Sequence, residues 1–155
     1  MSKIRLITNT GPLIALSRID CLFHATDLYE ILVPANVVLE WRSAPKIWPA
    51  SLPVLDATVP DPMLRIHLDL GEASVIESAL QNQISQVLID EQKARKVARN
   101  VYGLTVVGTA RVLVELHQAG LIGPLSPLFK ILGASSYWID QSIVNWALKS
   151  VGEEA

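Results

Sequence analysis

The chain has 155 residues, of which 50% are hydrophobic and 18% are charged. This balance excludes a disordered polypeptide and favours a globular fold with a sizeable core. The net charge of −2 excludes a globally basic nucleic-acid binder, so any such contact would need a local basic patch. The single cysteine, Cys21, excludes a disulfide framework within the chain, and its apolar neighbours favour a buried, inert thiol.

The N-terminal residues lack the apolar stretch and cleavage site of a secretory signal. The longest apolar runs are far shorter than the ~20 residues that a membrane-spanning helix needs. We therefore expect a cytoplasmic protein without a membrane contact, built as a single domain over residues 1–155.

The first part of the chain alternates short apolar runs with signals for helix starts. Residues 4–8 predict a buried strand, Thr10 can cap the next helix, and Pro12 suits its first turn. Residues 29–33 predict a second strand, and Pro34 then opens a helix that runs to about residue 41.

Residues 42–62 form a proline-rich excursion, in which a long helix cannot run. A short strand is expected near Val54. A connection of this length in a compact domain is usually functional or interface-forming. Its prolines and its tryptophan are Pro45, Pro49, Pro53, Pro60, Pro62 and Trp48.

Two helices and a strand follow the excursion. Residues 68–82 predict a helix in which Asp69 and Glu72 have the spacing of a capping box. A strand then ends at Asp90, and a short helix follows over residues 91–100. The apolar spacing predicts that these two helices bury Ala73, Ile76, Leu80, Ala94, Val97, Ala98 and Val101.

The last third predicts one more strand and three helices. The strand covers residues 104–108, and Thr109 can cap a helix to about residue 119. The C-terminal helices lie within 124–155, at about 124–132 and 140–149. Alternating buried strands and helices predict an α/β fold, a three-layer α/β/α sandwich around a parallel sheet of four to five strands.

Oxygen-bearing side chains stand where a parallel sheet collects functional groups, at the carboxyl ends of its strands. The first strand ends at Asn9, the third at Asp90 and Glu91, and two helices of the same sheet supply Glu40 and Glu72. Clustered carboxylates repel unless a cation neutralises them. Oxygen-only ligation suits Mg²⁺ or Mn²⁺.

Each of these residues also has a purely structural interpretation. Glu72 can be the capping-box acid, Asp90 can cap the following helix, Glu40 can be a solvated helix acid, and Asn9 an ordinary turn residue. The basic face of the 91–100 helix is either a solvated surface or a contact for a phosphate backbone. That face consists of Lys93, Arg95, Lys96 and Arg99.

Five ordered segments resemble the PIN-domain-like proteins, and most of all their small prokaryotic subgroup of predicted nucleic-acid binders. The resemblance implies an α/β/α nuclease that uses clustered acids and Mg²⁺ or Mn²⁺ to cut RNA, often as the toxin of a toxin–antitoxin pair. The segments are "NTGPLIALSRI", "VPANVVLEW", "LDLGEASVIESAL", "VLIDEQKARKVA" and "GLTVVGTARVLVELHQAGLI".

The resemblance also implies roles for single residues. Glu40, Glu72 and Asp90 match the catalytic and metal-binding acids, and Glu91 is a helper ligand. Asn9 stands where the first-strand aspartate usually stands, in a motif that often resembles D-T-S-P-L-I, and Gly11 takes the place of the serine. Because an amide brings no charge, we expect a weakened or one-metal site.

Two hypotheses follow. In the first, the protein is a Mg²⁺- or Mn²⁺-dependent ribonuclease, with Thr10, Lys93, Arg95, Lys96 and Arg99 contacting RNA and an antitoxin as its partner. In the second, it is an inactive PIN-like module that binds nucleic acid or a protein. Trp48, Trp138 and Trp146 would then form the contact surface. We expect a homodimer in either case.

Overall fold

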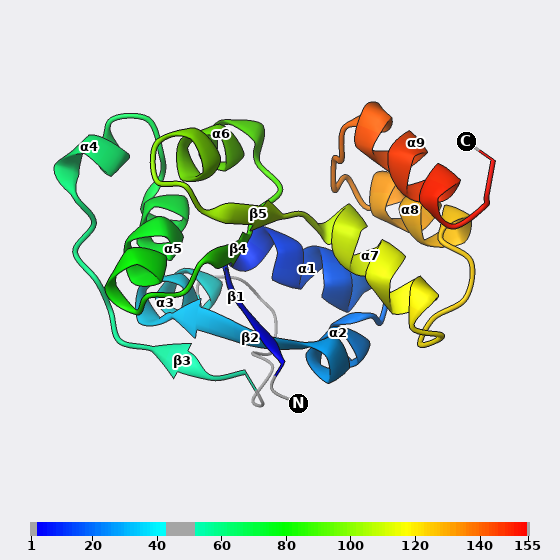
Figure 1. The fold of residues 1–155 in the computed structure, drawn as a ribbon, viewed down its shortest axis with the longest axis horizontal. Coiled ribbons are helices and arrows are strands. Elements are labelled where there is room, and N and C mark those ends of the chain that lie inside the picture. The colour runs from blue at the N-terminus through cyan, green and yellow to red at the C-terminus, as the bar shows by residue number, and fades with distance from the viewer. Residues whose placement is uncertain (1–2, 43–51, 155) are drawn as a thin grey trace.

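The computed structural model describes residues 3–42 and 52–154, so Pro45, Trp48 and Pro49 of the predicted excursion lie outside the described residues. The elements follow one another as Figure 1 shows. They are β1 (Ile4–Thr8), α1 (Thr10–Arg18), α2 (Leu22–Leu28), β2 (Tyr29–Pro34), α3 (Ala35–Arg42), β3 (Val54–Leu55), α4 (Pro62–Arg65), α5 (Leu70–Gln81), β4 (Gln86–Leu88), α6 (Gln92–Asn100), β5 (Thr105–Val107), α7 (Thr109–Gln118), α8 (Ser126–Ala134) and α9 (Gln141–Ser150).

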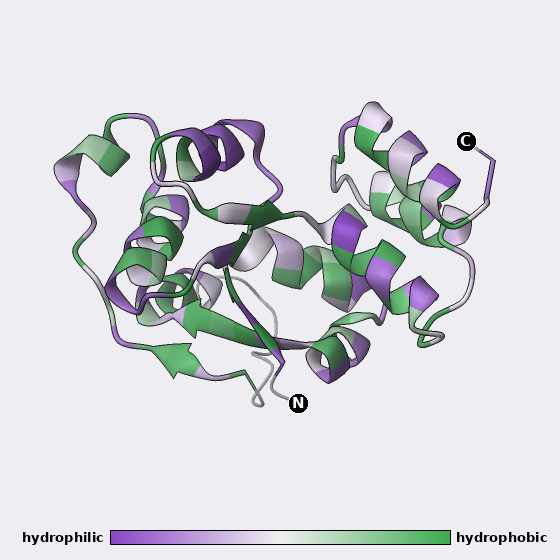
Figure 2. Cartoon of the chain, in the orientation of Figure 1, coloured by the Kyte–Doolittle hydropathy of each residue, from purple (hydrophilic) through white to green (hydrophobic). Residues whose placement is uncertain are grey.

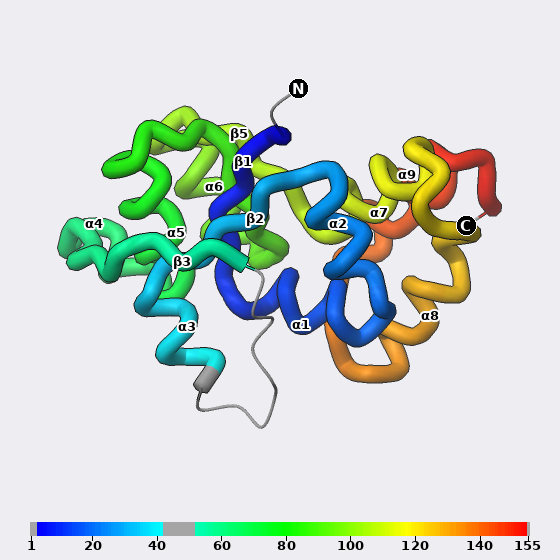
Figure 3. Tube along the Cα trace, turned by 90° about the horizontal axis from the view of Figure 1, so that it is seen from below, coloured from blue at the N-terminus to red at the C-terminus, as the bar shows by residue number. Residues whose placement is uncertain are grey.

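The five strands form one parallel sheet in the order β3-β2-β1-β4-β5. Helices α3, α5 and α6 lie on one side of it, and α1, α2 and α7 lie on the other (Figures 1 and 3). Helices α8 and α9 pack outside α1 and α7. This three-layer α/β/α arrangement confirms the predicted fold class.

The central strand β1 shows why its sequence is a continuous apolar run. Leu6 and Ile7 are fully buried, and Ile7 pairs with Leu32 on one side and Val87 on the other. A parallel strand covered by helices on both faces has no solvent side, so it needs no alternation of polar residues. The hydropathy colouring shows the apolar strands between helices whose outer faces are polar (Figure 2).

Some details of the helices differ from the sequence prediction. The N-cap positions of α1 and α7 are Asn9 and Gly108, one residue before the predicted Thr10 and Thr109. Asp69 does cap α5, since its Oδ1 accepts a hydrogen bond from the Glu72 backbone N–H at 2.8 Å. The short helices α2 and α4 were not predicted.

Two apolar residues that were predicted to be buried are exposed: the exposed fraction is 39% for Leu80 and 68% for Val101. Leu80 lies in the last turn of α5, and Val101 is the C-cap of α6. Helical periodicity predicts which side of a helix faces the core, but not how far along the helix the core extends. The predicted stripes are therefore correct for Ala73, Ile76, Ala94 and Ala98, while Val97 is half-buried.

The segment after β3 is held against α3 by one side chain. The Asn36 amide donates to the Thr58 carbonyl and accepts from the Thr58 N–H, both at 3.0 Å. The predicted strand near Val54 is confirmed as β3.

Cys21 is buried as predicted, and burial raises the pKa of its thiol to about 11. Within 3–42 and 52–154, no helix is both long and apolar enough to cross a membrane.

Candidate functional site

The site lies at the carboxyl edge of the sheet, where β1 and β4 run side by side. Thr8 pairs with Leu88 at the ends of these strands. Asn9 directly follows Thr8 and Asp90 comes two residues after Leu88, so both residues lie at the same edge of the sheet. The Oδ1 atom of Asn9 is buried and has no hydrogen-bond partner among the residues that the structure describes. A buried acceptor without a partner is costly, and such an atom is suited to receive a ligand.

Four carboxyl groups surround the start of α5, and we call them the acidic cluster: Glu40, Asp69, Glu72 and Glu91. Glu72 is only 9% exposed. Burial, together with hydrogen bonds and charge repulsion from Asp69 and Glu91, raises the pKa of Glu72 to about 8. The Glu72 carboxyl therefore favours its protonated form at neutral pH, with Asp69 and Glu91 as the neighbouring acceptors.

Glu40 joins the cluster from α3. Its Oε2 lies only 2.6 Å from the position that a Cβ atom on Gly71 would occupy, so this close approach depends on glycine. Burial and the charge of Asp69 raise the pKa of Glu40, and a hydrogen bond from the Thr10 side chain lowers it. The Thr10 hydroxyl, predicted to contact nucleic acid, is therefore engaged with an acid of the cluster.

Asp90 has a different environment. Its Oδ1 accepts the Thr109 backbone N–H at 2.7 Å, and its Oδ2 accepts the Thr109 hydroxyl at 2.5 Å. The Tyr137 hydroxyl also donates to Oδ2. Asp90 thus holds the first residue of α7. It does not cap α6, because Glu91 does so through Lys93 N–H at 3.0 Å and Ala94 N–H at 2.8 Å.

Tyr137 is a site residue that the sequence analysis missed. Burial and the carboxylate of Asp90 raise its pKa, so the hydroxyl remains a donor. A Cβ atom on Gly11 would lie 3.3 Å from the Tyr137 hydroxyl oxygen. The position where the D-T-S motif carries serine is therefore a glycine that leaves room for a tyrosine hydroxyl from a distant loop.

The basic face of α6 is divided in the structure. Lys93, Lys96 and Arg99 are exposed, as a surface role requires. Arg95 turns inward, where it donates to the Ile89 carbonyl at 2.7 Å and approaches the Cβ position of Gly108 to 2.8 Å. Burial lowers the Arg95 pKa, Asp90 opposes this effect, and the like charge of Arg99 adds to it.

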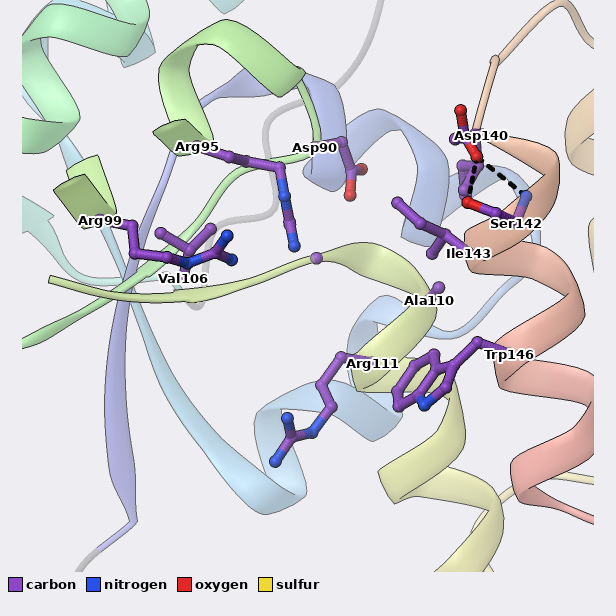
Figure 4. A pocket seen from close by; sticks show the side chains of 12 residues that line it. Asp90, Arg95, Arg99, Val106, Ala110, Arg111, Asp140, Ser142, Ile143 and Trp146 are labelled. Carbon is purple, nitrogen blue, oxygen red and sulfur yellow. Dashed lines mark hydrogen bonds between the residues drawn. The ribbon is translucent and has the colours of Figure 1, made fainter. Parts of the chain in front are cut away.

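Beside Asp90 a pocket of about 430 Å³ opens between α6, β5 and α7 on one side and α9 on the other (Figure 4). Arg95 and Arg99 reach it from α6, Arg111 from α7 and Trp146 from α9. The basic residues of the pocket therefore lie near the partly exposed indole ring of Trp146.

The donor atoms of the site are of the type that binds a divalent cation, but the described side chains are not arranged around one position. The acidic cluster and Asn9 Oδ1 offer only oxygen donors, as Mg²⁺ and Mn²⁺ prefer. Across residues 3–42 and 52–154, however, no group of three or more His, Cys, Asp or Glu side chains is placed to hold a metal ion. The predicted set is divided, with Glu40 and Glu72 in the cluster and Asp90 bound to Thr109 and Tyr137.

The family model of the PIN domain matches residues 5–153. No curated protein and no solved structure matches the chain.

Proposed function

The chain belongs to the PIN-domain family, and from this premise we propose that it is a Mg²⁺- or Mn²⁺-dependent ribonuclease that serves as the toxin of a toxin–antitoxin pair. PIN domains are typically nucleases, so the sandwich is a nuclease fold. The observation that supports the proposal best is the acidic cluster itself. Four carboxyl groups gather at one sheet edge beside a buried, unpartnered amide oxygen.

In this proposal, Glu40, Glu72, Glu91 and Asn9 Oδ1 would hold the metal. A bound divalent ion activates water and stabilises the charge that develops on the phosphate. Glu72 must give up its proton to become a ligand, and Asp69 and Glu91 fix the direction of its carboxyl group. Asn9 adds an oxygen but no charge, which weakens the site by roughly tenfold to a hundredfold, by analogy with altered ligand shells.

Asp90 is the fourth acid of the proposed site. A carboxylate has about four lone-pair sites, and three donors already use Asp90, so about one remains for a ligand. Its bonds to Thr109 and Tyr137 keep the start of α7 and the loop before α9 at the edge of the sheet. We assign Asp90 both tasks.

The test is cleavage of an unstructured RNA by the purified protein with Mn²⁺. Wild type should cut, Glu72→Gln and Asp90→Asn should not, and Glu30→Gln, an exposed acid of β2, should cut like wild type. The nuclease proposal fails if wild type does not cut, or if Glu72→Gln and Asp90→Asn cut equally well.

The second candidate is an inactive PIN-like module that binds nucleic acid or a protein. It is favoured by Asn9 and Gly11, which replace the acid and the hydroxyl of the usual motif. It is also favoured by Trp138, whose side chain is 84% exposed and suits a contact with an antitoxin or a second copy. Calorimetry separates the candidates, since the module predicts no heat of binding at millimolar Mn²⁺.

A further inference from the structure

The pocket beside Asp90 combines cations with an aromatic ring, and we call it the arginine–tryptophan pocket after Arg95, Arg99, Arg111 and Trp146. Its volume of about 430 Å³ lies in the range of about 300–1,000 Å³ that is usual for small-ligand sites. Three guanidinium groups line this hollow, a charge that suits an anionic ligand.

The cations of the pocket are poorly neutralised. Arg99 is exposed and forms no hydrogen bond or ion pair with any other residue that the structure describes. Arg111 contacts Glu115 at 3.0 Å in an exposed pair one helical turn apart, and such pairs bind weakly. Neither guanidinium group is therefore held by a buried contact with a described residue, and each is free to turn toward a phosphate.

The two acids that line the pocket are already engaged. Asp90 accepts from Thr109 and Tyr137. Asp140 is the N-cap of α9 and accepts from the N–H of Ser142 at 2.8 Å and from its hydroxyl at 2.5 Å. Both carboxylates bind neutral donors of the protein and keep their charges, so three arginines against two aspartates leave the lining of the hollow positive by about one charge.

Trp146 supplies the apolar part. It projects from α9 beside Arg111, with Ile143 one turn earlier (Figure 4). Its side chain is 46% exposed, although apolar residues of α9 such as Ala147 and Leu148 are buried. Proteins that bind single-stranded nucleic acids commonly stack bases on an aromatic side chain that lies beside cationic residues.

We infer that the arginine–tryptophan pocket binds one nucleotide of a single-stranded RNA, with its base on Trp146 and its phosphate between Arg99 and Arg111. This inference rests on the proposed function. Asp90 lines the pocket and Glu91, the next residue, belongs to the acidic cluster, so a nucleotide in the pocket lies next to the phosphate to be cut. The pocket then positions the strand by stacking and charge, without reading a particular sequence.

The experiment measures binding without cleavage. A short fluorescent single-stranded RNA, and the same sugar–phosphate chain without bases, are titrated with the protein in EDTA. Trp146→Ala should weaken RNA binding roughly tenfold to a hundredfold, because a stacked base contributes about that much affinity, and leave the base-free chain unaffected. Arg99→Ala should weaken both ligands equally, because it removes a phosphate contact.

Matched controls stand outside the pocket. Phe23→Ala removes a more exposed aromatic ring on α2, and Arg65→Ala removes an exposed arginine of α4; both should bind as wild type. Trp146→Phe keeps an aromatic face and should retain most of the affinity, which separates stacking from loss of fold.

Several outcomes overturn the inference. Wild-type binding weaker than about 100 µM, the loose limit of nonspecific nucleic-acid binding, would do so. So would equal effects of Trp146→Ala on both ligands, or equal losses in Trp146→Ala and Phe23→Ala. Failure of the nuclease proposal looks different, since RNA would then bind in the pocket as described but remain uncut with Mn²⁺.

Discussion

Replacing Glu72 by glutamine should stabilise the metal-free protein while removing its activity. The carboxyl group is buried among Asp69 and Glu91, and its pKa is raised from 4.5 to about 8. Between these pH values the folded chain holds a proton that the unfolded chain has lost. The free energy of unfolding of wild type therefore falls as the pH rises from about 4.5 to about 8.

The magnitude follows from the width of this interval. Each pH unit is worth about 1.4 kcal/mol, so the loss reaches on the order of 3 kcal/mol at neutral pH. A glutamine is neutral at every pH and can still donate to the two carboxylates. We expect Glu72→Gln to gain on the order of 3 kcal/mol at pH 8, or roughly 10 °C in melting temperature for a chain of this size.

The assay is thermal unfolding followed by circular dichroism in EDTA, at pH 5, 7 and 8. The melting temperatures of wild type and Glu72→Gln should agree at pH 5 and separate as the pH rises. Glu30→Gln is the matched control, because Glu30 is an exposed strand residue and should show no such separation. A mutant no more stable than wild type at pH 8 would refute the reasoning about the cluster.

Three further substitutions test individual contacts. Tyr137→Phe removes one donor from the charged Asp90 and should destabilise the protein by about 1.5–3 kcal/mol in urea unfolding; no loss would mean that this hydrogen bond is not formed. Asn9→Asp adds the missing charge and should raise Mn²⁺ affinity roughly tenfold to a hundredfold by calorimetry. Unchanged affinity would place the metal away from β1. Gly71→Ala brings a Cβ to 2.6 Å from Glu40 Oε2 and should reduce Mn²⁺ affinity without lowering the melting temperature, and unaltered binding would show that Glu40 is no ligand.

The sequence predicted the sheet well, because a parallel strand buried on both faces leaves a local trace. The run at β1 and the turn signals around Pro34 are such traces, and both matched the structure. The capping box at Asp69 was also readable, since its two residues are three apart. The same spacing marked Glu72, although not its crowding by Glu91, which lies at the N-cap of α6.

Contacts between distant segments could not be predicted. Asp90 is bound by Thr109, 19 residues away, and by Tyr137, 47 residues away, and no periodicity connects these positions. Arg95 is a similar case. The helical pattern placed it on the polar face of α6, but its inward turn depends on the space that Gly108 leaves on another element. Such pairings arise from the tertiary arrangement alone.

The central claim is that Glu72 gives up a proton to hold a divalent ion. Calorimetric titration with Mn²⁺ at pH 7, in buffers of different ionisation enthalpy, counts the protons released on binding. The account predicts release of close to one proton by wild type and weak binding without release by Glu72→Gln. Binding by wild type with no proton release, or identical titrations of the two proteins, would contradict it.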